Sequence, residues 1–315
     1  MGTLIAKKYP TKLFLKAADH TYVECGTGGK AWSCWGGKTG GTAFNSGTGS
    51  TRRADAIAGS NEHAGITCYL VNGVCHQAAN RILVSAGILV SAARGYALSQ
   101  AVFGTYGRAG VWPCSAPFNQ QVGVTGDLPE CGAAASPAAA KSVMKSAPKL
   151  TLSSADSAQI RSVKSLYNGF DPKTSTAMEA IEFNIQVFER DLSHRFRGAL
   201  NKTTLQGLRL AKTSIETGHH QLNADWMRQQ MSPMEFVKNF NQLTDRFQDD
   251  CANALKKKPQ YRRLLELNPD ERLVLADPDA LEVAFGKGTA RRVYGKQLST
   301  AKAEAAAASA SKPKG

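Results

Sequence analysis

One cysteine stands where a thiol can become a nucleophile. Cys75 follows Gly73 and Val74, at a point where an apolar segment ends and a helical pattern begins. Unpaired N–H groups and the positive end of the helix dipole favour the thiolate form of a cysteine in such a position. Cys75 is therefore the candidate nucleophile, and the rest of the chain must supply its partners.

A cysteine nucleophile needs a base within hydrogen-bonding reach, and the base usually needs a third group that fixes its ring. His20 is the favoured base because it opens a segment that alternates like a strand. His63 opens a later strand-like segment whose length, at about 3.3 Å per residue, would place it far from Cys75. His76 adjoins the cysteine, and side chains one residue apart on a helix do not face each other.

Two short motifs resemble those of the papain-like cysteine hydrolases. Residues 73–78, Gly-Val-Cys-His-Gln-Ala, are similar to the nucleophile motif of that superfamily, and residues 33–36, Ser-Cys-Trp-Gly, resemble the segment that follows its catalytic histidine. Histidine, serine and cysteine follow one another in the order of the circularly permuted members, which include lecithin-retinol acyltransferase-like proteins and bacterial cell-wall amidase-like proteins. The resemblance covers about residues 12–105.

The resemblance implies a third catalytic residue beside His20. The position that holds asparagine in papain-like enzymes is occupied by Ser33. A serine would hold the imidazole ring less firmly than an asparagine, so another group such as Glu24 is the alternative.

The same comparison implies an oxyanion hole. Papain-like enzymes carry a glutamine six residues before the cysteine, and this chain carries Tyr69 there. The Cys75 N–H can supply one donor, and Asn72 or Gln77 is the expected second. Trp35 is expected in the core of the hairpin, with a substrate contact as the alternative.

The chemistry implied is cysteine-dependent amide hydrolysis through an acyl-enzyme, as a peptidase, amidase or deamidase. The substrate would be a peptide, a peptidoglycan stem or a glutamine side chain, and neither a cofactor nor a metal ion is required. The resemblance of this chain to bacterial permuted amidases is compatible with a secreted effector toxin. The helical half would then bind an inhibitor, immunity or adaptor protein.

Two other classes of function remain open on the sequence alone. A non-enzymatic interaction protein would use a helical domain to bind its partner. A basic nucleic-acid binder is favoured by the net charge of +14, although no nucleic-acid-binding motif accompanies it. The clustered basic residues lie near the C-terminal end; they are Lys256–Lys258 with Arg262 and Arg263, and Lys287, Arg291, Arg292 and Lys296.

The chain is expected to be α+β, with four parts. Residues 1–132 should form the papain-like domain with a small antiparallel sheet, 133–159 an Ala/Ser/Pro linker, 160–298 an all-α helical bundle and 299–315 a disordered tail. The expected strands are 12–15, 20–25, 31–35 and 66–71, with a hairpin loop at 26–29. The expected helices are 75–83, 98–103, 178–196 and 205–226, a third bundle helix from Ser232 and a fourth from Asn268.

Cysteine usage and hydropathy give expectations about the compartment. Seven cysteines without a two-residue-gap pair argue against structural zinc, and reduced thiols are the default in the absence of a signal segment. The longest apolar run, residues 82–90, is too short to cross a membrane. A soluble chain is expected, and it should be cytoplasmic when synthesised. Export without a cleavable signal peptide is left open.

His219 and His220 are expected on a solvated helix face, with no metal role.

Overall fold

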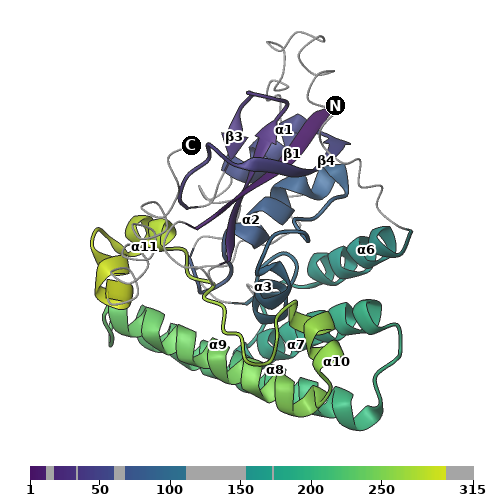
Figure 1. Ribbon diagram of the computed structural model, residues 1–315, viewed down its shortest axis with the longest axis vertical. Helices are drawn as coiled ribbons and strands as arrows, with labels where there is room; N and C mark the ends of the chain where they lie inside the picture. The colour runs from purple at the N-terminus through teal and green to yellow at the C-terminus, as the bar shows by residue number, and fades with distance from the viewer. Residues whose placement is uncertain (12–17, 33–34, 60–67, 111–153, 172–173, 296–315) are drawn as a thin grey trace, which may run out of the picture.

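The computed structural model describes residues 1–11, 18–32, 35–59, 68–110, 154–171 and 174–295. An antiparallel sheet and its helices occupy one end of the molecule, and a helical bundle occupies the other (Figure 1). The expected α+β class is therefore confirmed. Of the linker predicted at 133–159, residues 133–153 lie outside the described residues, and residues 154–159 are helical, which corrects that part of the prediction. The tail from 299 also lies outside the described residues.

The sheet has four strands in the order β3-β2-β1-β4, and every neighbouring pair is antiparallel. Its strands are β1 (Gly2–Pro10), β2 (Asp19–Cys25), β3 (Ala31–Trp32) and β4 (Thr42–Gly49). The predicted hairpin is present between β2 and β3, where the Cys25 N–H donates to the Lys30 carbonyl at 2.9 Å. All seven residues of β2 are buried, so this strand lies at the centre of the N-terminal half.

Two strand predictions have other outcomes, and two strands were not predicted. The unpredicted strands are β1 and β4, and β1 has three consecutive buried residues, Leu4–Ala6, where a strict alternation would have marked a strand. The strand predicted at 66–71 is wrong over its described part, where residues 68–73 form a turn and Leu70 takes a left-handed φ of 64°. The strand predicted at 12–15 lies outside the described residues.

The N-terminal half contains the helices α1 (Thr51–Gly59), α2 (Cys75–Ile82) and α3 (Tyr96–Phe103), with a 3-10 turn at Leu83–Ala86. The two predicted helices of this half are thus confirmed, and α1 was not predicted. All eight residues of α2 are buried, and its polar side chains are hydrogen-bonded, as burial requires. The partners include Ser99 for His76, the Gly104 carbonyl for Gln77, the Thr105 carbonyl for Asn80 and the Tyr106 carbonyl for Arg81.

The helical half consists of α6 (Ser154–Gly169), α7 (Ala177–Phe196), α8 (Lys202–Met227), α9 (Pro233–Leu255), α10 (Lys258–Leu265) and α11 (Pro278–Phe285). The first two predicted bundle helices match α7 and α8. The third matches α9, whose predicted start is confirmed by a capping box between Ser232 and Glu235. A fourth helix from Asn268 is wrong: residues 268–276 are not helical, and the next helix begins at Pro278.

One hydrophobic cluster runs through both halves of the chain. It joins Val23 of β2 and Leu98 of α3 to Phe240 of α9 and Leu281 of α11. The segment between α10 and α11 runs along the bundle and leads to α11 (Figure 1). The helical half therefore contributes to the same core as the sheet, which allows it to contribute to a site there.

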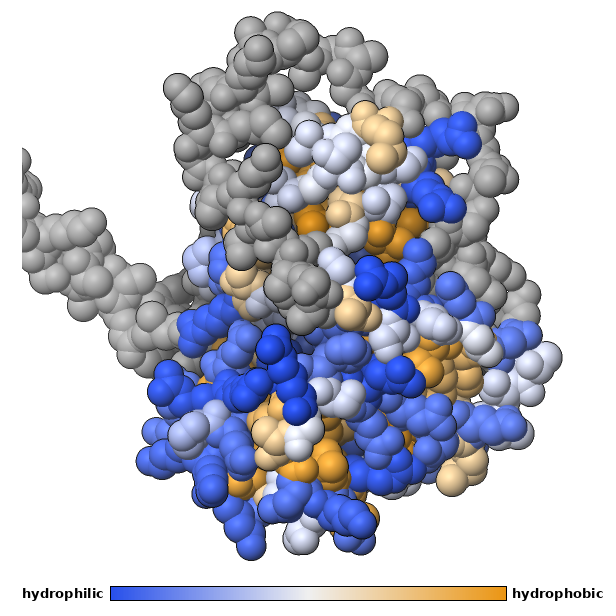
Figure 2. Space-filling model, turned by 90° about the vertical axis from the view of Figure 1, so that its right-hand side faces the viewer, coloured by the Kyte–Doolittle hydropathy of each residue, from blue (hydrophilic) through white to orange (hydrophobic). Residues whose placement is uncertain are grey.

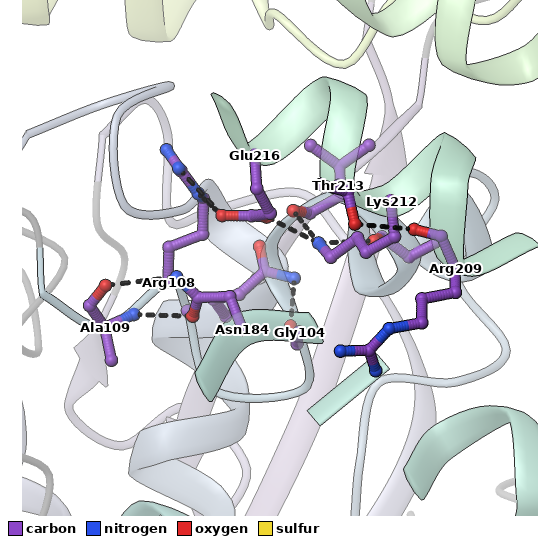
Figure 3. A network of polar contacts seen from close by, with 12 residues as sticks. Gly104, Arg108, Ala109, Asn184, Arg209, Lys212, Thr213 and Glu216 are labelled. Carbon is purple, nitrogen blue, oxygen red and sulfur yellow. Dashed lines mark hydrogen bonds and ion pairs between the residues drawn. The ribbon is translucent and has the colours of Figure 1, made fainter. Parts of the chain in front are cut away.

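A buried group of charges ties α8 to the N-terminal half (Figure 3). The Arg108 guanidinium donates two hydrogen bonds, at 3.0 and 2.9 Å, to one carboxylate oxygen of Glu216, and a third to the Val71 carbonyl. Lys212 pairs with the other Glu216 oxygen at 2.6 Å and donates to the last carbonyls of α3. Burial raises the pKa of Glu216, but the two cations outweigh it and lower that pKa to about 2.

His219 lies beside these charges and is buried, so its expected place on a solvated face is wrong. Its ring packs against Phe103 and Phe240, with centroids 6.2 and 5.2 Å away, and the centroids of those two rings are 5.8 Å apart. Burial lowers the pKa of His219 well below its ordinary value, so the ring is neutral. It packs as an aromatic residue of the core.

The outer surface of the helical half is largely hydrophilic, with small and separated apolar patches on the face in Figure 2. The large apolar side chains that are exposed belong to different elements, such as Met178 on α7, Leu210 on α8 and Val283 on α11. Single exposed residues of this kind are normal on a protein surface. Among the described helices, none has the length and apolar character needed to cross a membrane.

The buried charge group gives the first prediction. Glu216→Gln leaves Arg108 and Lys212 buried without a counter-charge, so it should lower the free energy of unfolding by about 3–5 kcal/mol. Glu182→Gln is the matched control, because Glu182 pairs with Arg209 at the surface, where such pairs contribute less than about 1 kcal/mol. Urea unfolding of both variants measures the difference, and equal losses would contradict this account.

Candidate active site

Cys75 is the first residue of α2, and it packs against the start of β2. Its Sγ lies 3.9 Å from the Asp19 carbonyl oxygen, which also accepts a hydrogen bond of 3.0 Å from Nε2 of His76. The two contacts fix α2 against the strand residue that precedes His20. As the first residue of the helix, Cys75 has no intrahelical acceptor for its N–H.

His20 occupies the centre of the site. Its Nδ1 is hydrogen-bonded to Oδ2 of Asp277 at 2.9 Å, and its ring is also hydrogen-bonded to the Cys75 side chain. The ring is fully buried. A thiol, an imidazole and a carboxylate therefore form one connected unit, and the two residues predicted as nucleophile and base are brought together.

Asp277 comes from the helical half and was not predicted. It is the N-cap of α11, and its Oδ1 accepts the Asp279 N–H at 2.9 Å, so each carboxylate oxygen has its own donor. The Asp277 N–H donates to the Tyr69 hydroxyl at 2.8 Å. The hydrogen bonds to the Asp279 N–H, the Tyr69 hydroxyl and the His20 ring together hold Asp277 in one orientation.

The charges around the ring decide its protonation state. Burial lowers the pKa of His20, but the charge of Cys75 and the hydrogen bonds to Asp277 and Cys75 raise it to about 10. The neighbouring His76 is neutral, because burial lowers its pKa to about 4. His20 is therefore the protonated histidine of the pair. Its stabilising contribution is complete below pH 6.5 and is lost as the pH rises towards 10.

Two residues enclose the His20 ring. Tyr9 lies directly opposite it across the β1–β2 pair, and the two rings stack with centroids 4.8 Å apart. Gly36 has a φ of 89° and lies at the ring edge, where an added Cβ would be 3.1 Å from Cε1 of His20 and 3.5 Å from Oδ2 of Asp277. A side chain at position 36 would push against the pair that orients the base.

Ser33, the predicted third residue, lies outside the described residues, so its role stays a prediction. Within the described residues, a carboxylate that is hydrogen-bonded to the His20 ring comes from Asp277. The alternative, Glu24, forms an ion pair with Lys7 and accepts the Gly28 N–H at 3.2 Å. It therefore holds the hairpin instead of the imidazole.

The residues predicted for the oxyanion hole have structural partners. Gln77 accepts the Val74 N–H at 3.2 Å and donates to the Gly104 carbonyl at 3.1 Å, so its amide caps α2. The Asn72 side chain accepts the Cys68 N–H at 3.3 Å. The NH2 group of Gln77 is thus engaged by the fold, whereas the contact of Asn72 with the Cys68 N–H uses its side-chain oxygen. The roles of Asn72 and of the Cys75 N–H as oxyanion donors stay predictions.

Trp35 is buried and packs against Tyr69, with ring centroids 5.0 Å apart. It therefore belongs to the core, the place preferred for it over substrate contact. Because Tyr69 receives the Asp277 N–H, Trp35 packs against the residue that holds Asp277. The position that holds the oxyanion glutamine in papain-like enzymes thus carries a residue that is hydrogen-bonded to Asp277.

The thiols are in different states. Cys25 and Cys68 are disulfide-bonded, which corrects the expectation of reduced thiols. Cys75 and Cys251 are free. Burial raises the pKa of Cys251, which keeps it an inert thiol of the bundle core. Among the described residues, no cluster of histidine, cysteine, aspartate or glutamate could hold a metal ion.

No protein-family model, no curated protein and no solved structure matches this chain. A function for this chain must therefore be inferred from the geometry of Cys75, His20 and Asp277. A protonated imidazole between a sulfur and a carboxylate is an arrangement that can make a nucleophile, deliver a proton and hold the ring between the two tasks.

The charge pairing at the ring gives the second prediction. Cys75→Ser removes the charge that most raises the pKa of His20, so that pKa should fall by about 1–3, the effect of one adjacent opposite charge. An NMR titration of the His20 ring measures it. Cys251→Ser, at the other free thiol, should leave the titration unchanged. A His20 pKa that is the same with and without Cys75 would show that the two groups are not paired.

Proposed function

We propose that this chain is a cysteine hydrolase that cleaves amide bonds, with Cys75, His20 and Asp277 as its catalytic triad. The observation that carries the proposal is the position of the His20 ring, hydrogen-bonded both to the Cys75 side chain and to the Asp277 carboxylate. A buried histidine with a purely structural role needs hydrogen-bond partners. A free thiol at the start of a helix is not required to be one of them.

Acylation begins with a thiolate and an imidazolium. The Cys75 sulfur attacks the carbonyl carbon of the substrate, a C–S bond forms, and the carbonyl electron pair moves onto oxygen. The Cys75 N–H, at the positive end of α2, is the donor available to that oxyanion. As the oxyanion collapses, the C–N bond breaks and the His20 proton passes to the leaving amine. A thioester remains on Cys75.

Deacylation uses the histidine in the opposite direction. The neutral His20 ring now accepts a proton from water, and the water oxygen attacks the thioester carbon. The C–S bond breaks, the carboxylic acid product leaves, and the thiolate–imidazolium pair is restored. The proton that His20 gives to the amine during acylation is recovered from water during deacylation. Substrate and water are therefore the only reactants.

Asp277 orients the imidazole throughout the cycle. Its hydrogen bond fixes Nδ1 as the protonated ring nitrogen, which leaves the other nitrogen to exchange a proton with sulfur, amine and water. The carboxylate also stabilises the imidazolium form. This is the role for which the papain-like pattern predicted Ser33.

The permuted papain-like resemblance supports the same proposal. Its histidine is expected on a strand before the cysteine helix, and His20 lies on β2 while Cys75 begins α2. On this basis the substrate class is a peptide or a peptidoglycan-like amide. The outer face of the helical bundle is then available to bind an inhibitor, immunity or adaptor protein.

The disulfide-bonded cysteines also bear on the compartment in which the protein would act. Disulfide-bonded Cys25 and Cys68 are typical of proteins that function in an oxidising compartment. A free Cys75 at α2 can remain a nucleophile in the same molecule. We therefore place the activity outside the reducing cytoplasm, as a secreted bacterial effector would require.

The third prediction tests the triad by kinetics. On peptides and on peptidoglycan, Cys75→Ala and His20→Asn should abolish amide cleavage, and Asp277→Asn should lower kcat about 10²–10⁴-fold by releasing the imidazole ring. Asp279→Asn is the matched control, because it removes a carboxylate from the same helix start that is not bonded to His20. It should keep kcat/KM within about twofold of the unmodified chain.

Thermal unfolding of each variant separates loss of chemistry from loss of fold. If folded Cys75→Ala and His20→Asn proteins cleave as fast as the unmodified chain, the hydrolase proposal fails. Equal losses in Asp277→Asn and Asp279→Asn would remove Asp277 from the triad and leave the other two residues in place.

A further inference from the structure

Residues 36–41, Gly-Gly-Lys-Thr-Gly-Gly, form a segment that we call the glycine loop. It follows β3 and precedes β4, and its residues 37–40 are exposed. Gly36 and Gly40 have left-handed φ values of 89° and 72°. Four glycines in six positions widen the range of backbone conformations that this segment can adopt.

One end of the glycine loop lies on the catalytic residues. Gly36 contacts the edge of the His20 ring and the Asp277 carboxylate, as the closeness of an added Cβ to both shows. The Gly37 N–H donates to the Tyr9 hydroxyl at 3.1 Å, and the Tyr9 hydroxyl lies 3.4 Å from the Gly37 carbonyl oxygen. Tyr9 itself stacks on His20. Tyr9 and the loop together therefore cover one side of the ring.

The other end of the loop is attached separately. The Gly41 N–H donates to the Tyr22 hydroxyl at 3.0 Å, and Gly41 leads directly into β4. The loop therefore has a fixed end at Tyr22 and a second attachment at Tyr9. Loss of the Tyr9 contact alone would free residues 36–40 while β4 stays in the sheet.

The triad is closed to a substrate in this arrangement. Cys75 and Asp277 are each 6% exposed and His20 is 0% exposed. A peptide carbonyl must come within bonding distance of Sγ, so some covering element must move before hydrolysis. Among the described segments that contact the triad, the turn that holds Tyr69 is buried, whereas residues 37–40 of the glycine loop are exposed and the loop is held through the Tyr9 and Tyr22 hydroxyls.

We propose that the glycine loop is a lid over the Cys75–His20–Asp277 site, and that the Tyr9 hydroxyl is the latch that holds it shut. This inference rests on the proposed function, because it describes how a substrate gains access to that site. Burial, followed by the charge of Asp277, raises the pKa of Tyr9, so the latch hydroxyl keeps its proton. Opening costs one or two hydrogen bonds.

The test compares two thiol reagents on the full chain. Iodoacetamide is small, whereas a maleimide that carries a polyethylene glycol chain is bulky, and peptide mass mapping gives the labelling rate of Cys75 with each. Tyr9→Phe keeps the stacked ring and removes the latch hydroxyl. It should raise the rate of bulky labelling about fivefold, the factor that one lost hydrogen bond gives, and change the rate with iodoacetamide much less.

A second variant acts on the lid from the other side. Gly36→Ala places a Cβ against the His20 ring at a φ that alanine rarely adopts, so it should displace the loop and also raise bulky labelling. Thr39→Ala, in the exposed middle of the loop, should leave both rates unchanged. Cys251 reports general unfolding, because it is buried in the bundle and far from the lid in the sequence.

The lid is disproved if neither Tyr9→Phe nor Gly36→Ala raises bulky labelling of Cys75, or if labelling of Cys251 rises equally. Failure of the hydrolase proposal gives a different result. In that case His20→Asn would leave the iodoacetamide rate at Cys75 unchanged, whatever the latch variants do.

Discussion

The hydrogen bond between His20 and Asp277 is the contact on which the site depends. It joins side chains that are 257 positions apart in the chain. Cys75 and His20 can meet through local packing of α2 on β2, but an imidazole held on one side only can rotate. The carboxylate that fixes it arrives from beyond the helical bundle. The site is therefore complete only when both halves of the chain are folded and docked.

Docking brings Asp277 to its place in several steps. Residues 268–276 cross to the N-terminal half, where Leu273 and Leu275 are buried in the shared core and the Ala18 N–H donates to the Val274 carbonyl at 3.2 Å. The buried charges of Arg108 and Glu216 join α8 to the turn that precedes α2. A charge left alone there is costly, so this group favours one docked arrangement over others.

The parts of the site that sequence analysis could predict are the local ones. A turn before an amphipathic helix marks Cys75, and an alternating segment marks His20, because both signals lie within a few residues. The third residue could not be found this way. Asp277-Pro278 is a helix start signal of the same kind as Asn268-Pro269, and only tertiary packing decides which of the two begins a helix. The permuted pattern predicts Ser33 because it places the orienting residue on the strand after the histidine.

The same division holds for the fold. The long bundle helices were predictable because the periodicity of α7 and the capping box of α9 are contained in the sequence. Burial of His219 was not predictable, because its two aromatic neighbours come from α3 and α9.

The measurement that tests the central claim most directly is acylation by an activated ester such as p-nitrophenyl acetate. The account predicts a burst of one nitrophenolate per chain, an acetyl group on the Cys75 peptide, and a slower burst in Asp277→Asn. Acetylation only at other residues, or a burst that does not depend on Asp277, would contradict it.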